Sequence, residues 1–412
     1  MLRISKWIAA AMMVAAVPAF ADSRFEKTLH GTVSYEGGRV TIESRFGSLT
    51  VHTSSAKQVV ARAIIRSTDE RLGEAFRFNV SNSSEGVVVR TEMPSVHMHG
   101  DNVSWSADVD VTIPERAPVS IRNAFGSIEV SGLRAPADIV NRQGSITARD
   151  IHGGEIETAF ASIIIEGSDG DTTVRNANGS VAVSDVQGQT SISNRFATVT
   201  VQRIGGGLSV ANTNGAVTIT DVKGPTSVSD TFGPVVARNI GGPMSIADVN
   251  GNVTAMDVAG DLEVDTRFGL VKAERVRGNL RVSNSNGSVT ASDINGSARV
   301  QTTYASVFLK GIDAAVDVEN QNGSISVGGL RGGCNPVSLR TTYAPIKIGL
   351  ASNASYTVNA HTTYGTINTE VPYTITSKNA SETSSTESGV IGNGQCKMEL
   401  TTTNGSITIT RE

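Results

Sequence analysis

Residues 190–225 read TSISNRFATVTVQRIGGGLSVANTNGAVTITDVKGP, and this stretch contains one 18-residue pattern twice. The first copy turns at Phe196-Ala197 and the second at Asn214-Gly215. In both copies a valine stands two residues after the small residue, and another aliphatic residue stands two further on. A fixed period of this length is typical of repeat architectures, so the repeat is the first feature to interpret.

The pattern continues from Ser120 to about Leu330 in aligned columns, which we number from the small residue as position zero. Small residues recur every 18 positions, with a single spacing of 17 between Gly144 and Ala161. Positions two and four are aliphatic in every copy and mostly polar residues stand between them, which indicates a strand with one buried face. A second strand is expected over positions ten to sixteen, after a glycine at position nine.

Each unit is therefore strand, turn, strand, turn, and it cannot bury its own apolar face. Stacking of neighbouring units buries a continuous core and pairs their backbone groups at about 4.8 Å per coil. The sequence predicts an all-β, single-stranded parallel β-helix or β-solenoid, which we expect to be right-handed.

The residue before position zero alternates strictly between an aromatic ring and a carboxamide. The aromatic members are Phe125, Phe160, Phe196, Phe232, Phe268 and Tyr304. The carboxamide members are Gln143, Asn178, Asn214, Asn250, Asn286 and Asn322. The true sequence period is therefore 36 residues, made of two 18-residue half-repeats.

Two coil sizes fit this alternation. A coil of 36 residues would place the aromatic rings in one structural stack and the asparagines in a separate ladder, both of which are stabilising arrangements. A coil of 18 residues would alternate the two residue types in one column. Segregated columns favour the larger coil, and an interior aromatic stack predicts that Phe232→Ala lowers stability by roughly 3–5 kcal/mol.

A second alternating column lies at position six. The carboxamide half has aspartate there in five copies: Asp150, Asp185, Asp221, Asp257 and Asp293. In a 36-residue coil these carboxylates would form a vertical ladder and repel one another. We interpret them as Asx-turns that accept backbone N–H groups. Bridging by Ca²⁺ along the ladder is the alternative, and no other cofactor is expected.

The two cysteines are predicted to form a disulfide, Cys334–Cys396. The strands that follow them align, Val337 with Met398 and Leu339 with Leu400, so the cysteines fall at the same corner of adjacent coils. Neighbouring strands bring Cα atoms close to the window of about 4.4–6.8 Å that a disulfide needs. Two free buried thiols are the alternative.

The N-terminus has the features of a secretory signal peptide. Arg3 and Lys6 precede an apolar run that ends in Ala19-Phe20-Ala21, a small-x-small cleavage site. The expected order is a signal peptide at 1–21, an N-terminal β cap at 22–119, repeats at 120–330, and irregular C-terminal coils at 331–412 with a mobile loop near 377–394. Export to the periplasm, the cell surface or the medium is therefore predicted.

The net charge limits the classes of partner that the protein is expected to bind. The chain has 35 Lys and Arg against 39 Asp and Glu, and removal of the two signal-peptide cations leaves 33 against 39, a net charge of −6. A mildly acidic protein is a poor ligand for nucleic acid or anionic membranes. We see no second apolar stretch that could span a bilayer, so no membrane span is expected in the mature chain.

No convergent set of reactive residues marks a catalytic site. His97, His99 and Asp101 could ligate a transition metal on one strand face, but a solvated loop is the simpler interpretation. We find no nucleophile elbow, phosphate loop or zinc-ligand spacing. The sequence therefore predicts a protein that is not an enzyme.

The repeat units and their context resemble a known family. The leader, the strand-rich segment ending in Val109-Asp110-Val111-Thr112-Ile113-Pro114, and the Asn-Gly-Ser-Val and Phe-Gly-Ser-Ile units are similar to the bacterial β-strand-repeat adhesin family, whose function is unknown. The resemblance covers most of the mature chain. It implies an exported β-solenoid and adhesion at the cell envelope, and it implies no catalytic residues.

These observations predict a non-enzymatic, exported, adhesin-like or structural protein of the cell envelope, whose partner is an envelope protein or a glycan. A glycan-cleaving β-helix is one alternative, although residues 120–330 lack the long loop insertions that such enzymes carry on one face. A periplasmic regulatory or sensor partner is the other.

Overall fold

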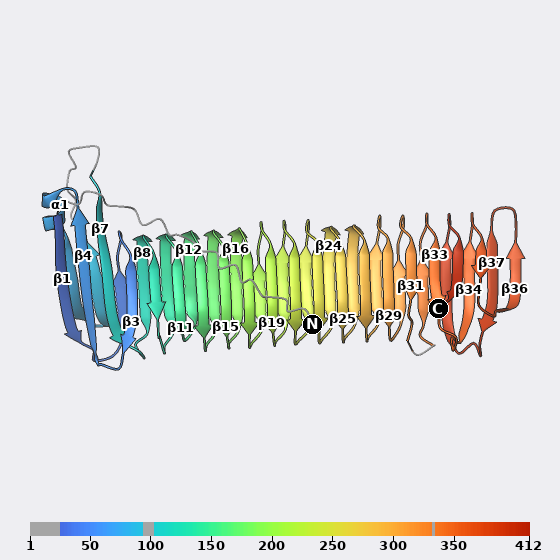
Figure 1. Cartoon of the computed structure of the whole chain (residues 1–412), viewed down its shortest axis with the longest axis horizontal. Coiled ribbons are helices and arrows are strands. Elements are labelled where there is room, and N and C mark those ends of the chain that lie inside the picture. Colours follow the sequence, from blue (N-terminus) through green and yellow to red (C-terminus); the bar gives the residue numbers. More distant parts are fainter. Residues whose placement is uncertain (1–24, 94–102, 332–333) are drawn as a thin grey trace, which may run out of the picture.

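The computed structural model describes residues 25–93, 103–331 and 334–412. It is a long stack of β-strands with one short helix, α1 (Glu70–Ala75), near the N-terminal end (Figure 1). Asp69 caps this helix, since its side chain accepts a hydrogen bond from the Leu72 backbone at 3.2 Å. The predicted signal peptide and the residues His97, His99 and Asp101 lie outside the described residues. Within the described part, no helix is long and apolar enough to cross a membrane.

The strands form two sheets, which run the length of the stack. Sheet 1 contains, in spatial order, β1 (Phe25–Ser34), β4 (Gln58–Ser67), β7 (Trp105–Pro114), β3 (Leu49–Ser54), β9 (Ile128–Ser131), β11 (Ile146–Ile151), β13 (Ile163–Ser168), β15 (Val181–Val186), β17 (Val199–Ile204), β19 (Val217–Val222), β21 (Val235–Ile240), β23 (Val253–Val258), β25 (Val271–Val276), β27 (Val289–Ile294), β29 (Val307–Ile312), β31 (Ile325–Gly328), β33 (Ile346–Leu350), β39 (Ile407–Arg411) and β35 (Ile367–Thr369).

Sheet 2 contains, in spatial order, β5 (Arg77–Ser83), β6 (Gly86–Glu92), β2 (Arg39–Glu43), β8 (Val119–Phe125), β10 (Ala137–Gln143), β12 (Gly154–Phe160), β14 (Thr172–Asn178), β16 (Thr190–Phe196), β18 (Leu208–Ala211), β20 (Thr226–Asp230), β22 (Met244–Asp248), β24 (Leu262–Phe268), β26 (Leu280–Asn286), β28 (Ala298–Thr302), β30 (Val316–Glu319), β32 (Val337–Arg340), β38 (Cys396–Thr402), β34 (Tyr356–Thr362), β37 (Ser385–Ile391) and β36 (Thr374–Ala380).

One coil consists of one strand from each sheet and takes 18 residues. Val199 pairs in parallel with Val217, and Asn178 pairs with Phe196, so each residue lies beside its counterpart in the next copy. The predicted β-solenoid is confirmed, but the 36-residue coil is wrong. The interior columns are the same in both half-repeats, so an 18-residue coil already stacks like on like inside the molecule. Only the outer corners distinguish the two halves, and solvent does not force them to match.

The core is made of aliphatic columns from both sheets. Val199, Val201 and Ile204 of β17 are each at most 1% exposed, and they represent positions two, four and seven. Ile192 of β16 faces them from sheet 2 and is equally buried. Because β-branched residues suit a pleated surface, the same residues favour the strands and fill the core between them.

A polar column also lies inside, three residues before position zero, where every described member is at most 8% exposed. Its members are Ser44, Asn123, Asn141, Thr158, Asn176, Asn194, Asn212, Asp230, Asp248, Thr266, Asn284, Thr302, Asn320, Thr341, Thr402 and Thr362. We call it the inner polar column. Burial raises the pKa of Asp230 to about 6 and also raises that of Asp248.

Both ends of the stack contain a coil that is out of sequence order. The coil of β2 and β3 lies between the coil of β6 and β7 and the coil of β8 and β9, although β6 and β7 follow it in the chain. The predicted cap region therefore contains two coils of the stack. The antiparallel strands β1, β4 and β5 then close this end and leave no long parallel edge exposed.

The C-terminal coil is inserted in the same way. Strands β38 and β39 lie between the coil of β32 and β33 and the coil of β34 and β35, which comes earlier in the chain. Figure 1 shows this as dark red strands among orange ones. The antiparallel strands β37 and β36 cover the last coil in sheet 2. The segment expected as a loop near 377–394 is thus largely a β-hairpin, because β37 pairs with β34 on one side and with β36 on the other.

The predicted cysteine pair is confirmed at disulfide distance. The sulfur atoms of Cys334 and Cys396 are 2.05 Å apart and their Cα atoms are 5.3 Å apart. The register is the predicted one, since Val337 pairs with Met398 and Leu339 with Leu400. The bond ties the inserted C-terminal coil to the coil that it stacks on.

Candidate functional site

The position-six column forms one outer corner, and its backbone is left-handed in copy after copy. Positive φ values occur at Gly132, Asp150, Gly167, Asp185, Arg203, Asp221, Asn239, Asp257, Arg275, Asp293 and Gly311. Gly, Asn and Asp tolerate this conformation best, which explains why they dominate the column. The arginines are exceptions, and each follows an aspartate in the preceding coil.

The aspartates at this corner bond to the next coil. Arg203 donates two hydrogen bonds of 2.6 Å to Asp185, and Arg275 donates bonds of 2.6 and 2.9 Å to Asp257. Asn239 donates to Asp221 at 2.8 Å. These arginines lower the pKa of Asp185 and of Asp257.

The uninterrupted ladder of repelling carboxylates is therefore wrong. In an 18-residue coil, successive aspartates are two coils apart, roughly 10 Å, and another residue stands between them. The side chains of the next coil, rather than Asx-turns, satisfy Asp185, Asp221 and Asp257.

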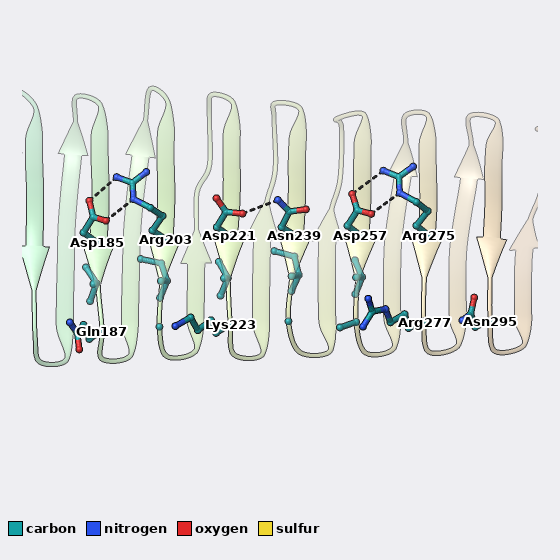
Figure 2. A pocket seen from close by; sticks show the side chains of 18 of the residues that line it. Asp185, Gln187, Arg203, Asp221, Lys223, Asn239, Asp257, Arg275, Arg277 and Asn295 are labelled. Carbon is teal, nitrogen blue, oxygen red and sulfur yellow. Dashed lines mark hydrogen bonds and ion pairs between the residues drawn. The ribbon is translucent and has the colours of Figure 1, made fainter.

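A shallow groove of about 1210 Å³ runs along this corner (Figure 2). Position six forms one wall, position eight contributes Gln187, Lys223, Arg277 and Asn295, and the buried position seven forms the floor. Within the wall, Arg203 and Arg275 pair with Asp185 and Asp257, and Asn239 bonds to Asp221. The stacking of the coils already accounts for these contacts, so the wall needs no ligand to explain them.

The opposite corner carries the aromatic and carboxamide residues in one exposed column. The rings are 42–62% exposed: Phe125, Phe160, Phe196, Phe232, Phe268, Tyr304, Tyr343 and Tyr364. Parallel bridges join Asn178 to Phe196, Phe196 to Asn214, and Asn214 to Phe232. The predicted aromatic stack and the separate asparagine ladder are thus both wrong, since the two residue types alternate in one column at the surface.

At the C-terminal end, this alternation follows the spatial order of the coils and not their order in the chain. The backbone N–H of Asn404 donates to the carbonyl oxygen of Thr342 at 2.7 Å, and the backbone N–H of Tyr364 donates to that of Thr403 at 2.6 Å. The inserted coil therefore places Asn404 between Tyr343 and Tyr364. The spatial order continues as Tyr304, Asn322, Tyr343, Asn404, Tyr364. Sequence duplication alone does not produce this order, because the last two coils are exchanged.

We call the exposed series from Phe125 to Tyr364 the aromatic–carboxamide column. It spans fifteen coils, or roughly 65–70 Å at the usual strand spacing. Rings recur every second coil, about 10 Å apart. At the N-terminal end the pattern changes, because Phe46 stacks directly on Phe125 with ring centres 5.3 Å apart and Trp105 contacts Phe46 edge-on.

Large aromatic side chains in regular array on a surface need an explanation beyond folding. Each ring presents an apolar face to solvent, and each neighbouring amide presents a donor and an acceptor. Such a surface can stack on flat, weakly polar groups and hydrogen-bond to hydroxyls beside them. Among the described residues, no group of three His, Cys, Asp or Glu side chains is placed to hold a metal ion.

Two features of the site escaped the sequence analysis. The inner polar column is visible in the sequence as Asn or Thr about every 18 residues, but this pattern alone does not show that the side chains are buried. The place of Asn404 between Tyr343 and Tyr364 has no local signal, because it depends on which coils meet at the end of the stack.

Comparison with known proteins adds little to this geometry. No protein-family model matches the chain, and no curated protein matches it. One similar solved structure is a "putative cell adhesion protein" from Clostridium sporogenes, with 9% identity over 94% of this chain and 100% of that chain, and a TM-score of 0.22. A similarity at this TM-score carries no argument about function. The fold itself shows that the chain is a β-solenoid.

Proposed function

We propose that this protein is a non-enzymatic, exported, adhesin-like β-solenoid that binds an extended polysaccharide of the cell envelope or cell surface along the aromatic–carboxamide column. The observation that supports the proposal is the exposed alternation of rings and carboxamides. The alternation continues in the spatial order of the coils at the C-terminal end, where that order differs from the order in the chain. A role in packing alone would not require rings that are about half exposed.

The chemistry of the column suits a glycan. Pyranose rings have flat faces of C–H groups, which stack on aromatic faces, and equatorial hydroxyls, which hydrogen-bond to amides. Rings about 10 Å apart would meet every second sugar of an extended β-1,4-linked chain, with one amide beside each intervening sugar. A linear array of this kind gains affinity from many weak contacts rather than from one deep pocket.

Export is supported by two independent features. The leader at 1–21 has the organisation of a signal peptide, and the paired cysteines suit an oxidising compartment. A location in the periplasm, on the cell surface or in the medium agrees with both.

The test compares two variants on a panel of insoluble polysaccharides that includes cellulose, chitin and peptidoglycan. Phe196, Phe232 and Phe268 are replaced together by alanine, and Phe308→Ala is the control. Phe308 is 46% exposed but lies on the outer face of β29, away from the column. We expect the triple variant to lose at least tenfold in binding at an unchanged melting temperature, and the control to bind as the wild type does. A wild type that binds no member of the panel, or a triple variant that binds equally well, contradicts the proposal.

A further inference from the structure

The inner polar column follows one hydrogen-bonding rule. Its asparagines donate Nδ2 to the carbonyl oxygen of position zero, in their own coil and often in the preceding coil. Asn141 donates to Gly144 at 3.1 Å and to Gly126 at 2.7 Å, and Asn284 donates to Gly287 at 2.6 Å and to Gly269 at 3.1 Å. These carbonyls face the interior of the corner, so the side-chain donor takes the place of water.

Two adjacent coils break this rule. Asp230 and Asp248 stand where asparagine, threonine or serine occurs elsewhere, and they are 2% and 4% exposed. They are direct partners across sheet 2. In each, Oδ1 accepts a backbone N–H of the corner, from Thr231 at 2.8 Å and from Asn250 at 3.2 Å.

The second oxygen of each carboxylate occupies the place of the missing amide. Asp230 Oδ2 lies 3.2 Å from where a β-carbon on Gly233 would stand, and Asn141 Nδ2 lies 3.0 Å from the same point on Gly144. Asp248 Oδ2 takes the corresponding position beside Gly251. An acceptor thus faces the carbonyls that a donor faces in other coils.

These oxygens have no hydrogen-bond partner within the described structure. Asp230 Oδ2, Asp248 Oδ2 and Thr266 Oγ1 are all buried and unpartnered, and Thr266 is the neighbour of Asp248 in the next coil. No side chain of the described residues donates to the carbonyl oxygens of Gly233 and Gly251, and no Lys or Arg is paired with either carboxylate. Buried oxygens that face one another without a donor are strongly unfavourable.

We infer that Asp230, Asp248, Thr266 and the carbonyl oxygens of Gly233 and Gly251 form a site for one Ca²⁺ ion inside the corner. Two carboxylates balance its charge, and all five donors are the hard oxygens that Ca²⁺ prefers. The coil spacing fits as well, since oxygens about 4.8 Å apart can each lie about 2.4 Å from an ion between them. The position-six aspartates, given above as the alternative Ca²⁺ ligands, lie at the outer corner and are not part of this site. Asp185, Asp221, Asp257 and Asp293 already have side-chain partners there.

The direct test measures Ca²⁺ binding to the mature chain by equilibrium dialysis after removal of metal with EDTA. We expect about one tight Ca²⁺ per wild-type chain and none in D230N/D248N. The double variant restores the residue that this column uses in other coils, so it should fold. The matched control is D221N/D257N, which changes two outer aspartates and should bind as the wild type does.

Stability gives a second readout that separates the site from a folding defect. Millimolar Ca²⁺ should raise the melting temperature of the wild type and of D221N/D257N by several degrees over EDTA, and should leave D230N/D248N unchanged. Absence of binding with equal melting temperatures in Ca²⁺ and EDTA would overturn the inference and leave a proton shared by the two carboxyls. Binding that survives in D230N/D248N would also overturn it.

Discussion

The two acidic columns of this solenoid contain the same residue type at repeating positions, yet their environments are opposite. At the outer corner, Asp185 and Asp257 lie in solvent and each meets an arginine of the next coil. In the inner polar column, Asp230 and Asp248 are buried beside each other, and Oδ2 of each has no hydrogen-bond partner among the described residues. The environment of a side chain in this solenoid therefore depends on the residue 18 positions away, which lies beside it in the next coil, and not on its neighbours in sequence.

The largest expected effect comes from placing a new carboxylate in the inner polar column. Asn284→Asp replaces a donor of two hydrogen bonds by a lone buried acceptor without a second aspartate beside it. We expect a loss of about 2–4 kcal/mol in the free energy of unfolding at neutral pH, measured by denaturant titration. The control is Asn286→Asp, two residues away in the exposed column, which should change stability by less than about 0.5 kcal/mol. Equal effects at both positions would remove the distinction between the columns.

The pH dependence in EDTA should have opposite signs for the two columns. Burial raises the pKa of Asp230 to about 6, above the unfolded value of about 3.9, so its stabilising contribution is present below pH 4 and is lost as the pH rises to 6. Relative to D230N/D248N, the wild type should lose about 2–3 kcal/mol over this window.

The outer carboxyls behave in the reverse way. Arginine lowers the pKa of Asp185 and of Asp257, so their contribution is present above pH 4 and is lost on acidification. Thermal unfolding of D185N/D257N should therefore approach that of the wild type as the pH falls toward 3. A wild type that parallels both double variants across the whole range would contradict the assignment of opposite environments.

The outer ion pairs should contribute little to stability. The side chains of Arg203 and Arg275 are about half exposed, so Arg203→Gln and Arg275→Gln should each lower the melting temperature only slightly. Added salt should shrink this difference further. A loss of stability as large as that of Asn284→Asp would mean that the outer corner also depends on its ion pairs.

The smallest effect is expected at the aromatic–carboxamide column. Phe232 is 50% exposed, so Phe232→Ala should change the free energy of unfolding by no more than about 0.5 kcal/mol, while polysaccharide binding weakens several-fold. Chemical denaturation checks the first part and affinity electrophoresis the second. A loss of about 3–5 kcal/mol would place the ring in the interior after all.

The sequence predicted the local structure of this molecule well. Positions two and four identified a buried face, and the alignment of Val337 with Met398 located the cysteine pair. Both rest on period-two and period-18 patterns that can be read along one chain.

Coil size and side-chain direction at the corners could not be read in this way. Asn194 and Phe196 have the same parity along β16, yet Asn194 is buried and Phe196 is 45% exposed, because the chain turns between them. The inserted coils at both ends depend on contacts between distant segments, so the neighbours of Asn404 were beyond any local pattern.

The 18-residue coil places Asn214 beside Phe232 and puts Phe196 two coils from Phe232. Paired cysteines test it directly by oxidation and non-reducing mass spectrometry. Neighbouring strands hold Cα atoms about 4.8 Å apart, within disulfide range, whereas residues two coils apart are separated by about 10 Å. We expect N214C/F232C to form an intramolecular disulfide and F196C/F232C to form none. Efficient cross-linking of F196C/F232C with none in N214C/F232C would contradict it and restore the 36-residue coil.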